Sequence, residues 1–339
     1  MGGFLAVPTA SGECMPKVPL IIDTDTAQDD CIAILAGLLD PSAELRAITM
    51  VAGNVGFEQQ VANAHLTLNV AGRLGSVPIH RGCTQPILRH WESAEDVHGD
   101  GSGGLSMSSD ALSESDEHAV NALLRLTAEA PGELSIVAIG PLTNLATAVI
   151  LDRGFAQRVK TLVIMGGSNN ARGNITASAE FNFYVDPEAA QIVLQAGFED
   201  LRIVPWAPLT LLDATFPRAD YDRLGALGTP LAGFYHRMCA ATIDYDESVG
   251  IDGSTHPDSL SVAVLLHPEL VTEQSGYRVD VETSSELTRG MSVMAWEKFD
   301  QPTNAQVIEA VDGAAFYDYL RGILATETVP NLPVAGLSD

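Results

Sequence analysis

The sequence predicts an α/β protein with a mostly parallel central sheet flanked by helices and a small antiparallel extension near the C-terminus. Short runs of β-forming residues alternate with helical patterns, and strands followed by helices at this spacing form right-handed βαβ crossovers. About 46% of the 339 residues are hydrophobic and 18% are charged. This composition supplies a large core and carries too little charge for a disordered chain.

The apolar runs that define the sheet occur at regular intervals over the first 205 residues. The expected strands are residues 18–22, 45–51, 134–139, 161–165 and 201–205. The expected helices are residues 30–39, 58–74, 117–130, 142–151 and 186–196. The last helix is clearly delimited, because Asp186 can cap its N-terminus, Pro187 fits its first turn and Gly197 follows its end.

Beyond about residue 210 the alternation becomes weaker. Residues 277–282 and 291–295 resemble a hairpin, and residues 305–310 and 313–324 resemble a final strand and helix. No Ser/Gly/Pro-rich linker or charge run divides the chain, so we expect one domain over residues 15–339. We expect residues 1–14 to form a flexible N-terminal extension.

The charge balance excludes several classes of partner. Eighteen Lys and Arg residues against forty-four Asp and Glu residues give a formal net charge of −26. Such a chain repels phosphate backbones and anionic lipids, so we expect neither a nucleic-acid nor a membrane partner. The four cysteines are widely spaced, which is typical of a protein in a reducing cytoplasm.

Four carboxylates follow the first predicted strand within eight residues. Asp29 and Asp30 could simply favour the N-terminus of the next helix. Asp23 and Asp25 have no such explanation, and no Lys or Arg lies near them in the sequence to offset their repulsion. A hard divalent cation would offset it, because carboxylate oxygens are the ligands that Ca²⁺ and Mg²⁺ take. The sequence therefore favours a metal site over helix capping with solvated acids.

This acidic run resembles a family signature. Residues 23–30 are similar to the Asp-x-Asp-Pro-Gly-x-Asp-Asp motif of the inosine-uridine-type nucleoside hydrolases, with Thr26 and Ala27 in place of Pro and Gly. Further similar segments follow in the family's order, at residues 53–54, 97–101, 139–144, 165–167, 173–174, 179–182 and 186–190. The resemblance implies the family's Rossmann-like fold and hydrolysis of the N-glycosidic bond of ribonucleosides, giving free base and ribose.

The resemblance also implies a calcium site. Asp25 would bind the ion and act as the base that activates water, because a cation lowers the pKa of water and a carboxylate takes its proton. The other implied ligands are the carboxylates of Asp30 and Asp258 and the backbone carbonyl of Ile139. This oxygen-rich set suits Ca²⁺.

Further residues are implied to bind the ribose hydroxyl groups, since amide and carboxylate side chains pair with groups that both donate and accept. They are Asp29, Asn54, Asn174, Glu180 and Asn182. For each asparagine the alternative is a turn or cap residue. Phe181 could pack near the sugar or belong to the core.

The resemblance is weaker at the end that would bind the base. Family members that accept pyrimidines carry His-Asp in this C-terminal motif, but here Pro257 precedes Asp258 and His256 lies one residue earlier. His256 could touch the leaving base or face away from it. His98 could line the base pocket or only hydrogen-bond within its Gly-rich loop. The sequence leaves purine or pyrimidine preference open.

Two other functions remain possible from the sequence. A haloacid-dehalogenase-like phosphatase also has an Asp-x-Asp loop after its first strand, with Asp23 as nucleophile. A catalytically impaired calcium- or nucleoside-binding homologue would explain the departures at Thr26, Ala27 and Pro257. For the nucleoside hydrolase, the family resemblance implies a homodimer or homotetramer.

Overall fold

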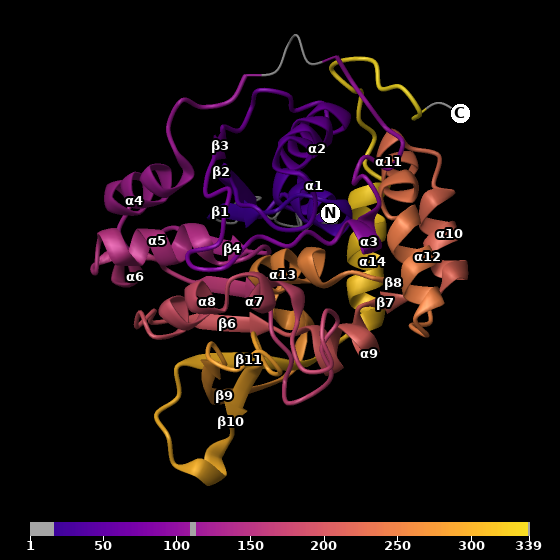
Figure 1. Ribbon diagram of the computed structural model, residues 1–339. Helices are drawn as coiled ribbons and strands as arrows, with labels where there is room; N and C mark the ends of the chain where they lie inside the picture. Colours follow the sequence, from indigo (N-terminus) through magenta and orange to yellow (C-terminus); the bar gives the residue numbers. More distant parts are fainter. Residues whose placement is uncertain (1–16, 109–112, 338–339) are drawn as a thin grey trace, which may run out of the picture.

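A nine-stranded sheet forms the centre of the molecule in the computed structural model, which describes residues 17–108 and 113–337 (Figure 1). In sheet order its strands are β10 (Ser292–Ala295), β9 (Val271–Val281), β11 (Ala305–Val311), β6 (Leu201–Val204), β5 (Leu162–Met165), β4 (Ser135–Ala138), β1 (Val18–Thr24), β2 (Ala43–Met50) and β3 (Ile79–Arg81). Pairing is parallel from β11 to β3, whereas β9 pairs antiparallel with both β10 and β11. The expected fold class is confirmed.

Helices cover both faces of this sheet. One face packs on α1 (Gln28–Leu39), α2 (Phe57–Val70), α13 (Pro257–Leu266) and α14 (Gly313–Leu324). The other packs on α4 (Ala119–Glu129), α5 (Thr143–Leu151) and α8 (Pro187–Leu194). Successive residues of β1 serve opposite faces, since Leu20 and Ile22 contribute to the first core and Ile21 to the second.

The remaining elements are short or lie at the end of the sheet where the strand-to-helix loops gather. They are α3 (Glu95–His98), α6 (Phe155–Arg158), α7 (Phe181–Val185), η2 (Trp206–Thr210), α9 (Leu211–Asp213), α10 (Arg218–Gly225), α11 (Pro230–Met238), α12 (Ala240–Ser248), η3 (Pro268–Leu270) and η4 (Glu297–Phe299). A separate two-stranded sheet joins β7 (Thr215–Phe216) to β8 (Ser254–Thr255).

Every strand and helix expected before residue 206 is present, with ends that differ by a few residues. The C-terminal hairpin is also confirmed as β9 and β10, although the antiparallel extension is an edge of the central sheet. Sequence patterns missed β3, which is three residues long, and α10 to α13. All ten residues of α13 are buried, so this helix has no exposed face and no amphipathic period.

The expected extension over residues 1–14 lies outside the described residues. Among the helices that are described, none has the length and apolar character needed to cross a bilayer. The described cysteines, Cys31, Cys83 and Cys239, are free thiols.

Candidate active site

Asp25 lies at the end of β1, where two glycines pack against its carboxylate. Its Oδ2 accepts a hydrogen bond of 2.9 Å from the backbone N–H of Asn54, and its Oδ1 has no hydrogen-bond partner. A β-carbon at Gly53 would lie 1.9 Å from Oδ2, and one at Gly140 would lie 2.7 Å from Oδ1. Burial, and secondarily the charge of Asp30, raises the pKa of Asp25 well above its usual range.

Asp30 stabilises the start of α1 and also faces the cavity. Its Oδ2 accepts hydrogen bonds from the backbone N–H of Ala27 at 3.0 Å and from Asn54 Nδ2 at 3.1 Å. Its Oδ1 accepts one of 2.6 Å from the Thr24 hydroxyl. Burial raises the pKa of Asp30 to about 6. The capping role considered from the sequence is therefore real, and it coexists with a position at the cavity.

Asp29 caps a helix other than its own. Its Oδ2 accepts hydrogen bonds from the backbone N–H groups of Asp258 at 2.7 Å and Ser259 at 3.2 Å, at the start of α13. Burial raises the pKa of Asp258 well above its usual range, and the charges of Asp30 and then Asp29 raise it further. Asp29 thus joins α1 to α13 and brings the carboxylate of Asp258 to the acidic loop.

Asp23 is fully buried behind this group and does not reach the cavity. Its Oδ1 accepts hydrogen bonds from the Thr49 hydroxyl at 2.5 Å and from Asn144 Nδ2 at 2.8 Å. Burial raises the pKa of Asp23 to about 7. This position suits a residue that supports the acidic loop.

On the opposite side of the cavity, Glu180 caps α7. Its Oε1 accepts a hydrogen bond of 2.8 Å from the backbone N–H of Asn182, and its Oε2 accepts one of 2.8 Å from Gly167. Burial raises the pKa of Glu180 to about 7. Asn182 donates from Nδ2 to the carbonyl of Ile139 at 3.0 Å, and Asn174 Oδ1 accepts from the backbone N–H of Phe181 at 2.9 Å.

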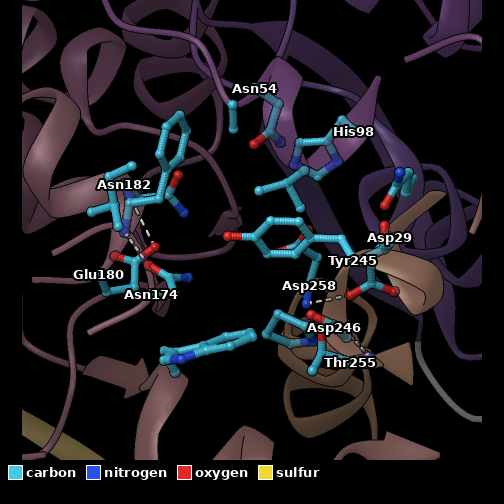
Figure 2. Close-up of a pocket in the computed structure, with 18 of the residues that line it drawn as sticks. Asp29, Asn54, His98, Asn174, Glu180, Asn182, Tyr245, Asp246, Thr255 and Asp258 are labelled. Atoms are coloured by element: carbon cyan, nitrogen blue, oxygen red, sulfur yellow. Dashed lines mark hydrogen bonds between the residues drawn. The ribbon is translucent and has the colours of Figure 1, made fainter. Parts of the chain in front are cut away.

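These groups surround a cavity of about 360 Å³, a volume typical of small-molecule sites. In Figure 2, Asn174, Glu180 and Asn182 lie on one side of the cavity and Asp29 and His98 on the other. The structure brings to its wall most of the residues expected from the sequence: Asp29, Asp30, Asn54, His98, Ile139, Asn174, Glu180, Phe181, Asn182 and Asp258. Asp25 lies just behind this wall, and His256 is also absent from it.

The two candidate base-pocket histidines occupy different environments. His98 lines the cavity, its Nδ1 is buried without a hydrogen-bond partner, and burial lowers its pKa to about 4. His256 is fully buried, with its Nδ1 3.0 Å from Asp29 Oδ1 and its Nε2 3.1 Å from the hydroxyl of Tyr235. Pro257 takes the place at the cavity, so the one-residue offset in the motif directs His256 behind Asp29.

Sequence reasoning missed the wall formed by α12 and η2. Thr242, Tyr245 and Asp246 line the cavity from α12, and Trp206 lines it from η2. Burial raises the pKa of Asp246 to about 6, and its Oδ2 accepts hydrogen bonds from both the N–H and the hydroxyl of Thr255. The signal that could have found this wall was the pair of aromatic residues, Trp206 and Tyr245, each with polar residues near it in the sequence.

The described residues include no ready-made group of three acidic, histidine or cysteine side chains with metal-binding geometry. The carbonyl of Ile139, an implied ligand, accepts a hydrogen bond from Asn182 instead. The donor chemistry still fits a hard cation. Asp25, Asp30 and Asp258 are buried, and the charge of Asp30 raises the pKa of the other two. No described Lys or Arg pairs with them, and Asp25 Oδ1 lacks a partner.

This chain is similar to known proteins in both sequence and fold. The family described as inosine-uridine preferring nucleoside hydrolase matches residues 20–318. The chain is 37% identical over 309 residues to an uncharacterised protein of Schizosaccharomyces pombe, covering 89% of this chain and 97% of that protein. It is 33% identical over 321 residues to the pyrimidine-specific ribonucleoside hydrolase RihA of Photobacterium profundum, covering 91% and 98%.

Among solved structures, the purine-preferring ribonucleoside hydrolase from Gardnerella vaginalis is similar with a TM-score of 0.82 and 27% identity, covering 91% of this chain and 98% of that one. The family match spans the acidic loop, the Glu180 segment and Asp258, the same residues that surround the cavity. The chain therefore belongs to the inosine-uridine preferring nucleoside hydrolase family and is a hydrolase that acts on nucleosides.

Proposed function

We propose that this enzyme hydrolyses the N-glycosidic bond of ribonucleosides with Asp25 as the base that activates water and Ca²⁺ as its cofactor. The observation that carries the proposal is the group of buried carboxylates at one wall of a nucleoside-sized cavity, with Asp25 held behind it by Gly53 and Gly140. In the reaction, water attacks C1′ of the ribose and gives a proton to Asp25. The C1′–N bond breaks and its electron pair leaves with the base nitrogen, which takes a proton from solvent. Asp25 returns its proton to solvent, and the products are free base and ribose.

Asp25, Asp30, Asp258 and the carbonyl of Ile139 would hold the cation. When bound, Ca²⁺ would offset the charge of the carboxylates and lower the pKa of a neighbouring water. The unpartnered Oδ1 of Asp25 supports this assignment, since a buried polar atom without a partner is costly. Asn54 donates to Asp25 from its backbone N–H and to Asp30 from Nδ2, and so links the two carboxylates.

The sugar would lie between the two sides of the cavity. Asp29, Asn54, Asn174, Glu180 and Asn182 supply donors and acceptors for its hydroxyl groups, and Phe181 provides an apolar surface beside it. A substrate that lacks one hydroxyl would leave a buried polar group unpaired, so the sugar end should discriminate strongly.

The base would lie toward His98 and α12. His98 is neutral at physiological pH, so one of its ring nitrogens can accept a hydrogen bond and the other can donate one. Tyr245 and Trp206 give aromatic surface for stacking with a base. The bacterial relatives are named for opposite preferences, so we include purine and pyrimidine ribonucleosides in the proposal.

Release of base from a panel of inosine, adenosine, uridine and cytidine tests the activity, with Ca²⁺ added and then removed by a chelator. Asp25→Asn should lower kcat by a factor on the order of 10²–10⁴, because the water then lacks its base. The matched control is Asp116→Asn, which changes an exposed aspartate far along the chain from the acidic loop. Full activity in Asp25→Asn would refute the assigned base, and no turnover of any nucleoside by the wild type would favour the impaired homologue.

Two expectations complete the proposal: a homodimer or homotetramer, which the family resemblance implies, and a cytoplasmic location, which the widely spaced cysteines favour. Light scattering of the purified chain tests the first, and fractionation of cells that produce it tests the second.

A further inference from the structure

The C-terminal segment after α14 turns back across the molecule toward α2 (Figure 1, yellow). The Thr328 hydroxyl donates to the carbonyl of Val70 at 2.9 Å, near the end of α2. Asn69, fully buried, binds the backbone of Leu332 at two points, accepting from its N–H at 2.7 Å and donating to its carbonyl at 3.1 Å. Asn331 Oδ1 accepts from the N–H of Leu74 at 2.8 Å. The segment is therefore bound along its length by specific contacts.

Its far end pairs with the loop that follows α3. Ala335 and Ser106 form an antiparallel bridge, in which the Ala335 N–H donates to the Ser106 carbonyl at 2.9 Å and the Ser106 N–H donates back at 3.3 Å. At Gly336, whose φ is +83°, a β-carbon would lie 2.5 Å from the carbonyl oxygen of Gly104. The backbones of the two segments thus approach too closely for a side chain at that position.

The loop held in this way continues directly from the base end of the cavity. Asp96, Val97 and His98 of α3 line the cavity, and the N–H of Gly101 donates to the His98 carbonyl at 3.1 Å. Asn63 Nδ2 lies 3.0 Å from the carbonyls of both Gly101 and Thr26, which joins this loop to the acidic loop. The C-terminal bridge at Ser106 fixes the other end of the same loop.

The contacts of the C-terminal segment lie beyond the residues that the family model matches. The family match ends at residue 318, within α14, whereas Thr328, Leu332 and Ala335 lie beyond it. The catalytic carboxylates all lie within the match. A segment outside the match thus supports a loop at the base end of the cavity.

We propose that residues 326–337 form a C-terminal strap that positions the loop after α3 and so sets the affinity for the base, while leaving the chemical step to the carboxylates. The proposal rests on the nucleosidase function proposed above. The residues of the strap are positioning residues, because they act through the loop and lie apart from the cavity wall.

Two variants test the strap: a truncation that ends at Thr326, and Ala335→Pro, which removes the N–H that donates to Ser106. Ala335→Gly is the matched control, since it keeps that N–H. Both test variants should raise KM for nucleosides by about five- to tenfold with kcat within about twofold of wild type, the scale of one or two lost hydrogen bonds. Inhibition by free ribose, which reports the sugar end alone, should stay unchanged.

Hydrogen exchange supplies a readout that needs no substrate. Amides of residues 95–107 should exchange faster in both test variants, whereas those of β1 and β4 should not. A folded Ala335→Pro variant with wild-type KM and unchanged exchange would overturn the strap, as would an equal loss of affinity for ribose and nucleosides. If the wild type turns over no nucleoside, the proposed function fails, and exchange in residues 95–107 still decides whether the strap holds the loop.

Discussion

At the scale of single residues, the lack of a side chain at Gly53 and Gly140 allows the carboxylate of Asp25 to occupy its position. Gly53→Ala would force a β-carbon to within 1.9 Å of Asp25 Oδ2, so the carboxylate must move. We expect kcat to fall at least about 100-fold, since a small displacement of a catalytic group has effects of that size. A base-release assay measures this. Gly56→Ala is the control, because no atom lies within 4 Å of the added carbon. Wild-type kcat in Gly53→Ala would contradict the role of Asp25.

His256 illustrates a second dependence, in which a buried residue orients one at the cavity. His256→Leu would remove a partner from Asp29 Oδ1 and leave the hydroxyl of Tyr235 unpaired, so we expect a stability loss of about 1–3 kcal/mol. Because Asp29 would be less well oriented, discrimination between ribonucleosides and their 2′-deoxy analogues should also decrease. Denaturant unfolding and the ratio of kcat/KM values measure the two effects.

The conservative variant separates this role from direct contact with the base. His256→Gln keeps a donor for Asp29 and should recover most of the sugar discrimination. If the loss of activity in both variants instead grows with the basicity of the leaving base, His256 acts on the base. The sequence motif left that role open.

At the scale of elements, α12 (Ala240–Ser248) joins the cavity through polar contacts more than through an apolar face. Only Ile243 and Asp246 of this helix are buried. Asp246→Ala would remove the acceptor for the N–H and hydroxyl of Thr255, so we expect a loss of about 1–3 kcal/mol and a higher KM as Tyr245 loses its support. Asp246→Asn is the control, since its amide oxygen still accepts both hydrogen bonds. Thermal unfolding and KM for a nucleoside measure the result, and equal behaviour of the two variants would show that the contact is unimportant.

The distribution of polar and apolar residues along each element explains which parts of the fold and of the site the sequence could predict. The acidic loop was recognisable because its four carboxylates are close in sequence, and the strand before it is a continuous apolar run. The helix α12 has no apolar stripe and α13 has no exposed face, so periodicity marked neither. The side on which His256 lies depends on a one-residue register between Asp29 and Asp258, which is fixed only when α1 and α13 pack together.

At the scale of the whole molecule, the buried acids make the stability of the metal-free protein depend on pH. Burial raises the pKa of Asp23 and Glu180 to about 7 and that of Asp30 to about 6. Their values in the unfolded chain lie near 4, so between about pH 4 and pH 7 the folded state binds more protons than the unfolded state. Stability must then decrease as pH rises through this window. This dependence is opposite in sign to that of a carboxylate stabilised by an ion pair.

Thermal unfolding in a chelator should therefore give a higher Tm at pH 5 than at pH 8, by more than about 2 °C. The surface charge within the total of −26 contributes in the same direction, but 0.5 M NaCl screens exposed charges and leaves the buried ones largely unaffected. The difference should therefore persist in salt.

Added Ca²⁺ should raise Tm more at pH 8 than at pH 5, because ligand carboxylates must lose their protons to bind a cation. Asp30→Asn should weaken both effects, since it removes one of the titrating acids and one proposed ligand. A calcium effect that is equal at both pH values, or absent, would show that these carboxylates do not share a cation.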